Sequence, residues 1–404
     1  DLALVGLNDS RRLAEIYINN GTAFSYSNQW SQNLTGLDEA AVSSGDINND
    51  GKNDLILAGD TGGAKWTKIY LNNGTSLNSD LNWTQNLLAV DKPAITFGDY
   101  NNDGRLDLTY IGCCDYHRVY NNTGTTFVQT ESESDPFDRL GGLFEGSLAF
   151  GDYDNDGDLD MIATGREGHT ILYVNNNSDF PDYGTDPESA ITNLEWSALS
   201  WLDIENDNDL DLAISGWAPN DAYIYIYINN RSITQNNSIP YYPSTFDNYS
   251  LSNGNMFFGW NNGSDNETIS TGLYYNLRIG TTNGGNEVIS SILGGTAGSG
   301  WAGGGANGYL GNMMQRRNIT LDGSRFQVGT TYYWSVQTID TGLAKSAWSP
   351  ELTFSLTYDF TPPTITLNAP NDGIVTNLST VIFNATVYDD ANLANVSLYG
   401  NWSN

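Results

Sequence analysis

The residues best suited to chemistry are acidic side chains that recur at alternate positions of four short loops. In the third loop, Asp152, Asp154, Asp156 and Asp160 occupy positions one, three, five and nine, and Gly157 occupies position six. This spacing lets alternate side chains converge on one point while the glycine turns the chain and the carbonyl at position seven adds a ligand. Oxygen ligands of this kind select Ca²⁺ over metals that prefer softer ligands. The loops therefore predict calcium sites.

The predicted ligand set covers all four loops and counts position seven through its carbonyl. The fourth loop departs from the pattern, because Glu205 replaces the short residue at position three and Asn208 replaces the glycine. Asparagine tolerates the left-handed backbone, so we expect a weaker or altered site there. Asp1 would be the last ligand of a loop that precedes this sequence. The full set is Asp46, Asn48, Asp50, Lys52 and Asp54; Asp99, Asn101, Asp103, Arg105 and Asp107; Asp152, Asp154, Asp156, Asp158 and Asp160; and Asp203, Glu205, Asp207, Asp209 and Asp211.

A plain turn is the alternative reading of each loop. Asp, Asn and Gly favour turns without any metal, and one copy would fit that reading equally well. Turn chemistry does not require the further aspartate three residues after position six, yet all four loops have it. Four copies in register therefore favour metal binding.

The loops belong to a tandem repeat, and this repeat decides the fold prediction. Each loop runs into an apolar segment that begins with its last aspartate, at 54–59, 107–112, 160–165 and 211–216, and residues 1–6 are a fifth copy. A second landmark, a strand followed by an Asn-rich turn, recurs at 17–22, 70–75, 120–123, 173–178 and 227–232. Asn-Gly at 20–21 and 73–74 predicts hairpins with type I′ turns. Units of about 50 residues with four strands have the size of propeller blades.

The sequence pattern agrees with an all-β protein, since no stretch shows the sustained apolar periodicity of an amphipathic helix. The net charge is −32, with only 16 Lys and Arg. Such a charge repels phosphate backbones and anionic lipid surfaces, so nucleic acids and electrostatic membrane docking are poor expectations. No apolar run is long enough to span a bilayer. Because the chain starts inside a repeat, we expect both ends to continue into further sequence.

Asn-x-Ser/Thr sequons number seventeen, about twice the count expected by chance from this composition. They predict an N-glycosylated extracellular protein; the alternative is that Asn-rich turns create sequons by accident. Five of them fall on the same hairpin of successive units: Asn20, Asn73, Asn121, Asn176 and Asn230. The others are Asn8, Asn33, Asn82, Asn236, Asn248, Asn262, Asn266, Asn318, Asn377, Asn384, Asn395 and Asn401.

A family resemblance rests on the segments Phe97-Gly98-Asp99-Tyr100 and Phe150-Gly151-Asp152-Tyr153. With them, residues 37–239 and the partial unit before them resemble FG-GAP/VCBS repeats, as in integrin-type propellers and secreted prokaryotic proteins. The resemblance implies calcium at the loops and a β-propeller closed by about seven blades. Only four full units and a partial one are present, so ring closure is left open.

After residue 240 the pattern changes to longer strands with aromatic anchors, expected at 256–260, 272–279 and 330–339. Residues 240–357 resemble a fibronectin type III-like sandwich, with Trp260 and the cluster Tyr332-Tyr333-Trp334 in its core. The glycine-rich insert 294–311 has no βαβ context and does not predict a cofactor site.

A linker, Thr361-Pro362-Pro363, follows this region. Residues 358–404, with strands expected at 365–368 and 381–387, resemble an incomplete Ig-like module of large, archaeal-type surface proteins. The predicted domains are thus propeller repeats at 1–239, a fibronectin III-like sandwich at 240–357 and an Ig-like domain at 358–404.

An enzyme is not expected. The two histidines, His117 and His169, stand in no triad or metal-ligand spacing. The adjacent Cys113 and Cys114 could form a strained vicinal disulfide or remain two thiols, and neither state suggests catalysis.

The preferred hypothesis is a calcium-stabilised, N-glycosylated structural or adhesive protein of the cell surface, such as a surface layer, stalk or filament subunit. Self-association or other surface proteins would be its partners. The alternative is a module that recognises glycans or proteins through its loops, with Trp30, Trp66, Trp217 and Trp301 as candidate exposed aromatics.

Overall fold

The computed structural model describes residues 1–19, 22–113, 116–130, 143–165, 169–178, 180, 191–218, 221–230, 237–252, 254–290, 311–356, 363–369, 382–389 and 396. These residues form an all-β protein of small antiparallel sheets. Within the described residues, helix is confined to single turns: α1 (Asn28–Ser31), α2 (Leu81–Thr84) and a 3₁₀ turn at Gly323–Arg325. The all-β prediction is confirmed.

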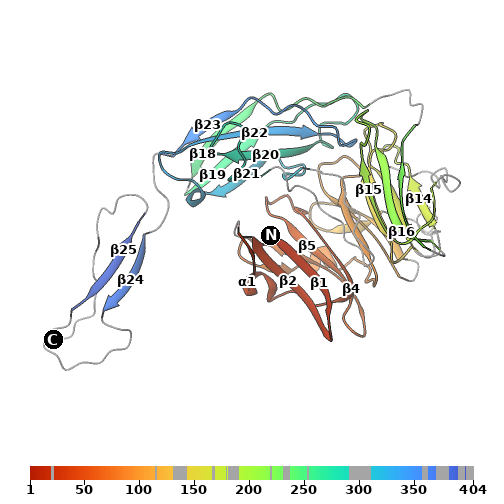
Figure 1. Ribbon diagram of the computed structural model, residues 1–404, viewed down its shortest axis with the longest axis horizontal. Coiled ribbons are helices and arrows are strands. Elements are labelled where there is room, and N and C mark those ends of the chain that lie inside the picture. The colour runs from red at the N-terminus through yellow and green to blue at the C-terminus, as the bar shows by residue number, and fades with distance from the viewer. Residues whose placement is uncertain are drawn as a thin grey trace.

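Five consecutive repeat units make the first part of the molecule (Figure 1). Unit 1 contains β1 (Leu2–Asn8), β2 (Arg11–Asn19) and β3 (Phe24–Tyr26). Unit 2 contains β4 (Asp38–Gly45), β5 (Asp54–Asp60), β6 (Lys65–Asn72) and β7 (Leu77–Ser79). Unit 3 contains β8 (Ala94–Gly98), β9 (Asp107–Gly112), β10 (Tyr116–Asn122) and β11 (Phe127–Gln129). Unit 4 contains β12 (Ser147–Gly151), β13 (Asp160–Gly165) and β14 (His169–Tyr173). Unit 5 contains β15 (Glu195–Leu202), β16 (Asp211–Ala218) and β17 (Asp221–Tyr227).

The apolar segment that the sequence predicts after each acidic loop forms a strand in every unit. β5, β9, β13 and β16 each begin at the last aspartate of an acidic loop, and β1 begins just after Asp1. The hairpin after β6 also forms, but its predicted type I′ turn is wrong. Gly74 has φ +87°, whereas Asn73 is not in the left-handed region that this turn type needs. Instead the Asn73 side chain accepts the backbone N–H groups of Thr75 and Ser76, which builds a longer loop.

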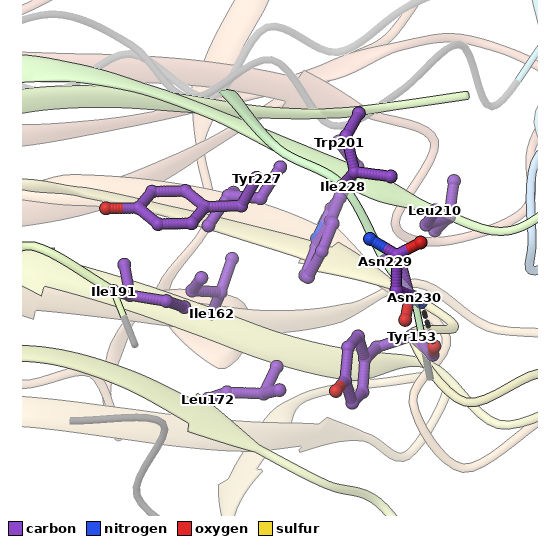
Figure 2. Close-up of a pocket in the computed structure, with 11 residues that line it drawn as sticks. Tyr153, Ile162, Leu172, Ile191, Trp201, Leu210, Tyr227, Ile228, Asn229 and Asn230 are labelled. Carbon is purple, nitrogen blue, oxygen red and sulfur yellow. Dashed lines mark hydrogen bonds between the residues drawn. The ribbon is translucent and has the colours of Figure 1, made fainter. Parts of the chain in front are cut away.

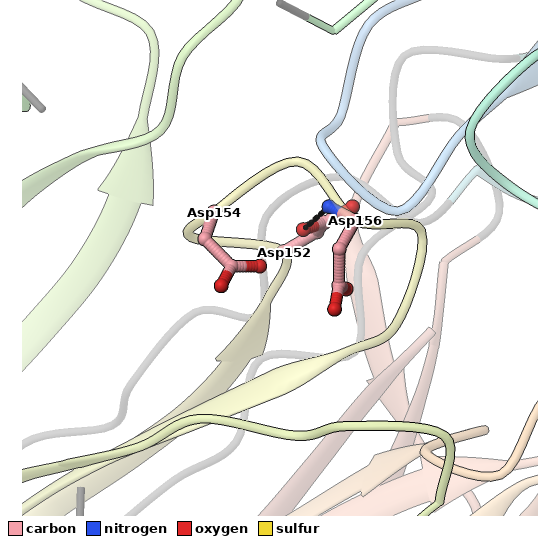
Figure 3. A group of neighbouring side chains, drawn as sticks. All are labelled: Asp152, Asp154 and Asp156. Atoms are coloured by element: carbon pink, nitrogen blue, oxygen red, sulfur yellow. Dashed lines mark hydrogen bonds between the residues drawn. The ribbon is translucent and has the colours of Figure 1, made fainter. Parts of the chain in front are cut away.

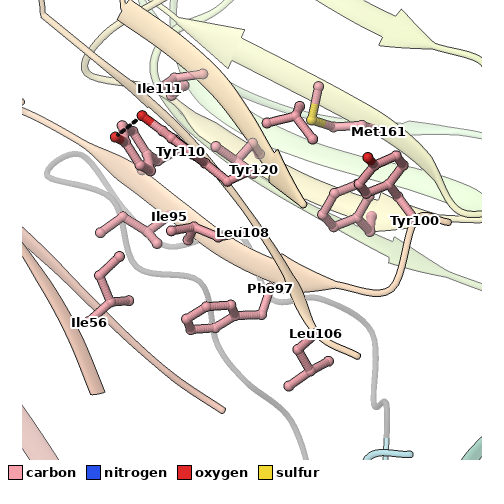
Figure 4. Close-up of a cluster of buried hydrophobic side chains, with 14 of the residues drawn as sticks. Ile56, Ile95, Phe97, Tyr100, Leu106, Leu108, Tyr110, Ile111, Tyr120 and Met161 are labelled. Atoms are coloured by element: carbon pink, nitrogen blue, oxygen red, sulfur yellow. Dashed lines mark hydrogen bonds between the residues drawn. The ribbon is translucent and has the colours of Figure 1, made fainter. Parts of the chain in front are cut away.

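The units pack through their first strands, since β4 lies beside β8, β8 beside β12 and β12 beside β15. A glycine at the end of the strand makes this close approach feasible. A Cβ on Gly98 would lie 2.5 Å from the Phe150 ring, and one on Gly151 would lie 2.6 Å from the Trp201 ring. Figure 4 shows the apolar side chains that fill the space between units, including Phe97. The Phe-Gly of units 3 and 4 therefore serves packing, because each glycine leaves room for an aromatic ring of the next unit.

Two further three-stranded sheets follow the repeats. One contains β18 (Phe246–Ser252), β19 (Asn255–Trp260) and β21 (Asn318–Asp322), and the other contains β20 (Tyr274–Gly280), β22 (Thr331–Ile339) and β23 (Leu352–Ser355). Both sheets contribute to one core, in which Trp260 and Trp334 are buried, as predicted. Tyr274, Met314 and Ile339 belong instead to the core shared with the repeats. We call residues 254–290 and 311–356 the downstream module.

The last described element is a hairpin of β24 (Thr364–Ala369) and β25 (Asn384–Tyr388), near the expected strands. Apolar side chains on it are exposed, among them Ile365 and Leu367. The predicted domain boundaries, the fibronectin III and Ig-like assignments and propeller closure remain predictions. Trp301, residues 294–310, Cys114 and the sequons Asn20, Asn236, Asn377, Asn395 and Asn401 lie outside the described residues.

Candidate metal centres

The four acidic loops occupy equivalent places, each joining the first strand of a unit to the second. We number them loop 1 (46–54), loop 2 (99–107), loop 3 (152–160) and loop 4 (203–211). In every loop the last residue pairs with the strand that precedes the loop, for example Gly98 with Asp107 and Gly151 with Asp160. The loop ends are thus fixed by the sheet, and only the intervening turn is free to shape a site.

The first aspartate of each loop organises that turn. In loop 1, Asp46 Oδ1 accepts the backbone N–H of Asp50 at 3.0 Å, and Oδ2 accepts that of Gly51 at 2.9 Å. The same pair of bonds recurs in loops 2, 3 and 4. Position six has positive φ throughout, including +68° at Asn208, so the expected tolerance of asparagine in loop 4 is confirmed.

Loop 3 gathers its carboxylates most closely. Asp152, Asp154 and Asp156 place one carboxylate oxygen each within 4.8 Å of the others (Figure 3). Asp152 is fully buried, whereas Asp156 is exposed. Three converging anionic oxygens with no basic side chain in the loop sequence fit a hard divalent cation. In the described residues no other group of acidic, His or Cys side chains meets this distance.

Loops 1 and 2 differ because position seven carries a basic side chain that pairs with position five. Lys52 Nζ lies 3.0 Å from Asp50 Oδ2, and an Arg105 guanidinium nitrogen lies 2.5 Å from Asp103 Oδ2. Position seven was included in the predicted set for its carbonyl, and the sequence reading did not consider its side chain. These pairs direct the position-five carboxylate at an internal cation. Loops 1 and 2 also have asparagine at position three, so they place only two carboxylates at positions one, three and five, whereas loop 3 places three.

The last aspartate of each loop joins the loop to the third strand of its unit. Asp54, Asp107, Asp160 and Asp211 each accept, through Oδ1, the backbone N–H of an asparagine at the end of that strand or two residues beyond it. Asp1 accepts the N–H of Asn19 in the same way. Asp107 is fully buried, and its Oδ2 has no hydrogen-bond partner. A cation bound in the acidic loop would satisfy this buried carboxylate oxygen.

Electrostatics agree with that reading. Burial raises the pKa of Asp107 to about 9, against the opposing backbone hydrogen bond from Asn122. Burial likewise raises the pKa values of Asp54, Asp99 and Asp152 to about 7. Removal from water penalises the charged form of these groups when no cation is bound. A divalent cation would reverse that preference, since it favours the carboxylate.

Three asparagines that the sequence reading did not single out connect neighbouring units. Asn122, Asn175 and Asn229 follow the last loop aspartate by 15, 15 and 18 residues, and each side chain donates to a carbonyl in the preceding unit's loop. The acceptors are the carbonyls of Ile47, Tyr100 and Tyr153. Each of these asparagines follows, by two residues, the tyrosine that begins the second repeated landmark. That constant spacing was the signal that could have revealed them.

The other predicted residues fall into three groups. Trp217 is exposed, whereas Trp30 and Trp66 pack partly against the core of units 1 and 2. His117 and His169 lie in β10 and β14, but their side chains are outside the described residues, and Cys113 is half-buried. Sequon side chains with described exposure are mostly exposed: Asn8, Asn33, Asn73, Asn82, Asn176, Asn230, Asn266, Asn318 and Asn384, while Asn121 and Asn262 are half-buried.

Comparison with known proteins identifies the repeat but no individual relative. Residues 46–110 and 152–214 match the model of the FG-GAP-like repeat. Both matches begin at the first aspartate of an acidic loop. No curated protein matches the chain. Among the described residues there is no helix long and apolar enough to cross a membrane.

Proposed function

We propose that this protein is a calcium-stabilised, N-glycosylated structural or adhesive component of the cell surface. FG-GAP-like repeats are found in this chain, and such repeats are typical of extracellular adhesion or recognition proteins, which are generally not enzymes. The observation that carries the proposal is the convergence of Asp152, Asp154 and Asp156 at a loop whose architecture recurs in four units. The full residue sets predicted above are the proposed ligands and glycosylation sites.

Calcium would act on stability through the strand junctions. Each loop holds carboxylates at the point where the first strand turns into the second, and the last aspartate also binds the end of the third strand. A bound cation would supply the positive charge that compensates these buried carboxylates. It would thereby hold three strands of a unit together. When the free calcium concentration is about a hundred times the dissociation constant of a site, binding there adds about 2.7 kcal/mol to the free energy of unfolding.

Exposed asparagines and exposed apolar side chains support the proposed N-glycans and the proposed assembly, respectively. Asn73, Asn176 and Asn230 lie at corresponding places of units 2, 4 and 5 and are exposed, so sugars would line one side of the row of units. Exposed apolar residues on the β24–β25 hairpin are suited to self-association or to another surface protein. A two-stranded hairpin is at best marginally stable by itself.

The proposal is tested on protein isolated from its native surface. Calcium removal by a chelator should lower the melting temperature, and readdition should restore it. Mass spectrometry of intact and deglycosylated material should show sugars on several of the exposed sequons. Native protein that melts at the same temperature with and without calcium, or that carries no sugar, would contradict the corresponding part of the proposal.

Ligand recognition is the second candidate, because the structure contains an apolar cavity between units 4 and 5. It has a volume of about 330 Å³ and is lined by Tyr153, Trp201 and Tyr227, among others (Figure 2). The buried Trp201 indole nitrogen has no hydrogen-bond partner. Screening an array of glycans, with Trp201→Phe as the comparison variant, tests this candidate. Binding that the variant weakens supports recognition, and an array without signal removes this candidate.

A further inference from the structure

The downstream module sits directly on the acidic loops. The backbone N–H of Asp152 donates to the Thr341 carbonyl at 3.3 Å, and the N–H of Asp99 donates to the buried Tyr274 hydroxyl at 3.3 Å. A Cβ on Gly157 would lie 2.1 Å from the Glu267 carbonyl oxygen, so the loop and the module touch with no room for a side chain. Because Tyr274 is also part of the core shared with units 2 to 4, this contact is continuous with the interior.

Three side chains of the module contact the first aspartates of loops 1, 2 and 3, one side chain for each loop. All three contacts are made to the same atom of the aspartate, Oδ2, although the three residues come from two separate turns of the module. The pairs are Arg316 with Asp46, at 3.6 Å from Nε; Gln315 with Asp99, at 2.5 Å from Nε2; and Thr341 with Asp152, at 2.8 Å from Oγ1.

These contacts determine which oxygen is left for a cation. A carboxylate oxygen has two lone pairs. In loop 3, Asp152 Oδ2 accepts from both Gly157 N–H and Thr341 Oγ1, whereas Oδ1 accepts only from Asp156 N–H. Oδ2 is therefore saturated, and the remaining lone pair of Oδ1 is available to a metal. Asp99 in loop 2 has the same arrangement, with Gln315 in place of the threonine.

Loop 1 receives a charge instead of a neutral donor. The Arg316 guanidinium also donates to the Gly51 carbonyl at 2.5 Å, so it is held against the loop at two points. With Lys52 already paired to Asp50, loop 1 carries two positive charges. Each of them opposes the approach of a divalent cation.

Loop 4 provides an internal reference. Its first aspartate, Asp203, accepts the N–H groups of Asp207 and Asn208, as in the other loops. Within the described ranges no hydrogen bond or ion pair joins this aspartate to the downstream module. The module thus pairs with the first aspartates of loops 1 to 3, whereas loop 4 is joined to loop 3 through the Asn155 amide, which donates to Asp209.

We propose that the downstream module sets the metal affinities of loops 1 to 3 from outside. Gln315 and Thr341 are positioning residues that orient the first carboxylates of loops 2 and 3 and strengthen calcium binding there. Arg316 is a resident cation that weakens it at loop 1. By thermodynamic reciprocity, calcium in loops 2 and 3 holds the module in place. This inference rests on the proposed calcium binding.

Calorimetric titration of the full chain with calcium tests the affinities. The variant Gln315→Met/Thr341→Val should weaken two sites about tenfold, because loss of an outer hydrogen bond to a ligand typically has that effect. Arg316→Met should strengthen one weak site about tenfold. The matched controls Gln327→Met, Thr353→Val and Arg317→Met lie on the same module; none of these side chains is bonded to a loop, and Arg317 instead donates to Asn262. They should leave every site unchanged.

Hydrogen exchange gives a second readout that requires no variant. In the wild-type chain, calcium should slow amide exchange in residues 311–317 and 338–346, and the double variant should lose this response. If wild-type protein binds calcium with the same affinities as all variants and these segments do not respond, the inference is wrong while calcium binding stands. If the wild-type chain binds no calcium at millimolar concentration, the proposed function fails as well.

Discussion

Asp154→Asn in loop 3 should reduce the stabilisation by calcium while leaving the metal-free fold intact. The substitution keeps the shape of the side chain but removes one of the three carboxylates that lie within 4.8 Å of one another. Loop 3 has no basic side chain in its sequence to offset the loss, unlike loops 1 and 2 with Lys52 and Arg105. Its calcium affinity should therefore depend strongly on this one negative charge.

The magnitude follows from mass action. If the substitution weakens binding about tenfold, then at a calcium concentration of about a hundred wild-type dissociation constants the stabilisation falls from about 2.7 to about 1.4 kcal/mol. For a chain of 404 residues, with an entropy of unfolding of about 2.1 cal/mol/K per residue, that difference lowers the melting temperature by roughly 1.5 °C. Thermal unfolding of both proteins, with calcium and with a chelator, measures it.

The control is Asp221→Asn, which removes an equal charge at the start of β17, outside every loop. With the chelator, both variants should melt within about 1 °C of the wild type, as surface substitutions usually do. An equal response of wild-type and Asp154→Asn proteins to calcium would refute the reasoning, since it would show that loop 3 is a turn that binds no cation.

Two further outcomes are expected. Asn175→Ala should lower the free energy of unfolding by about 2–4 kcal/mol in urea titrations, because it strands the buried carbonyls of Tyr100 and Leu159, whereas Asn176→Ala on the exposed side should change it by less than about 0.5 kcal/mol. Burial and the nearby Asp265 charge raise the pKa of Asp340 to about 8, so its contribution is greatest below about pH 4 and is lost as the pH rises through 8. Asp340→Asn should flatten this pH dependence of the melting temperature, and an unchanged slope would contradict the assignment.

The repeat made the strand pattern predictable. β5, β9, β13 and β16 begin at the predicted aspartates because the acidic loop and the apolar run after it are both local signals. The glycine of Phe97-Gly98 was recognised only as a family hallmark, and its physical role needed the neighbouring unit, since the ring it accommodates is Phe150 of unit 4. Contacts between units lie beyond what a single strand pattern can show.

The acidic loops could be located from the sequence, but their surroundings could not. Alternate spacing identified the converging carboxylates of loop 3, whereas the Lys52 and Arg105 pairs at position five depend on side-chain placement. The contact of Arg316 with Asp46 joins residues 270 positions apart, and no periodicity encodes it. The type I′ prediction at Asn73 failed for a similar reason, because the side chain itself took over the hydrogen bonds of the turn.

The final aspartate of each loop joins strands of the sheet as well as belonging to the proposed cation site. In loop 4, Asp211 still accepts the N–H groups of Asn229 and Ile204, although Glu205 and Asn208 have altered the rest of the loop. Mutational drift can therefore erase a binding site while the strands around it stay joined. A count of intact acidic motifs in this chain would therefore miss unit 5, although its strands are present.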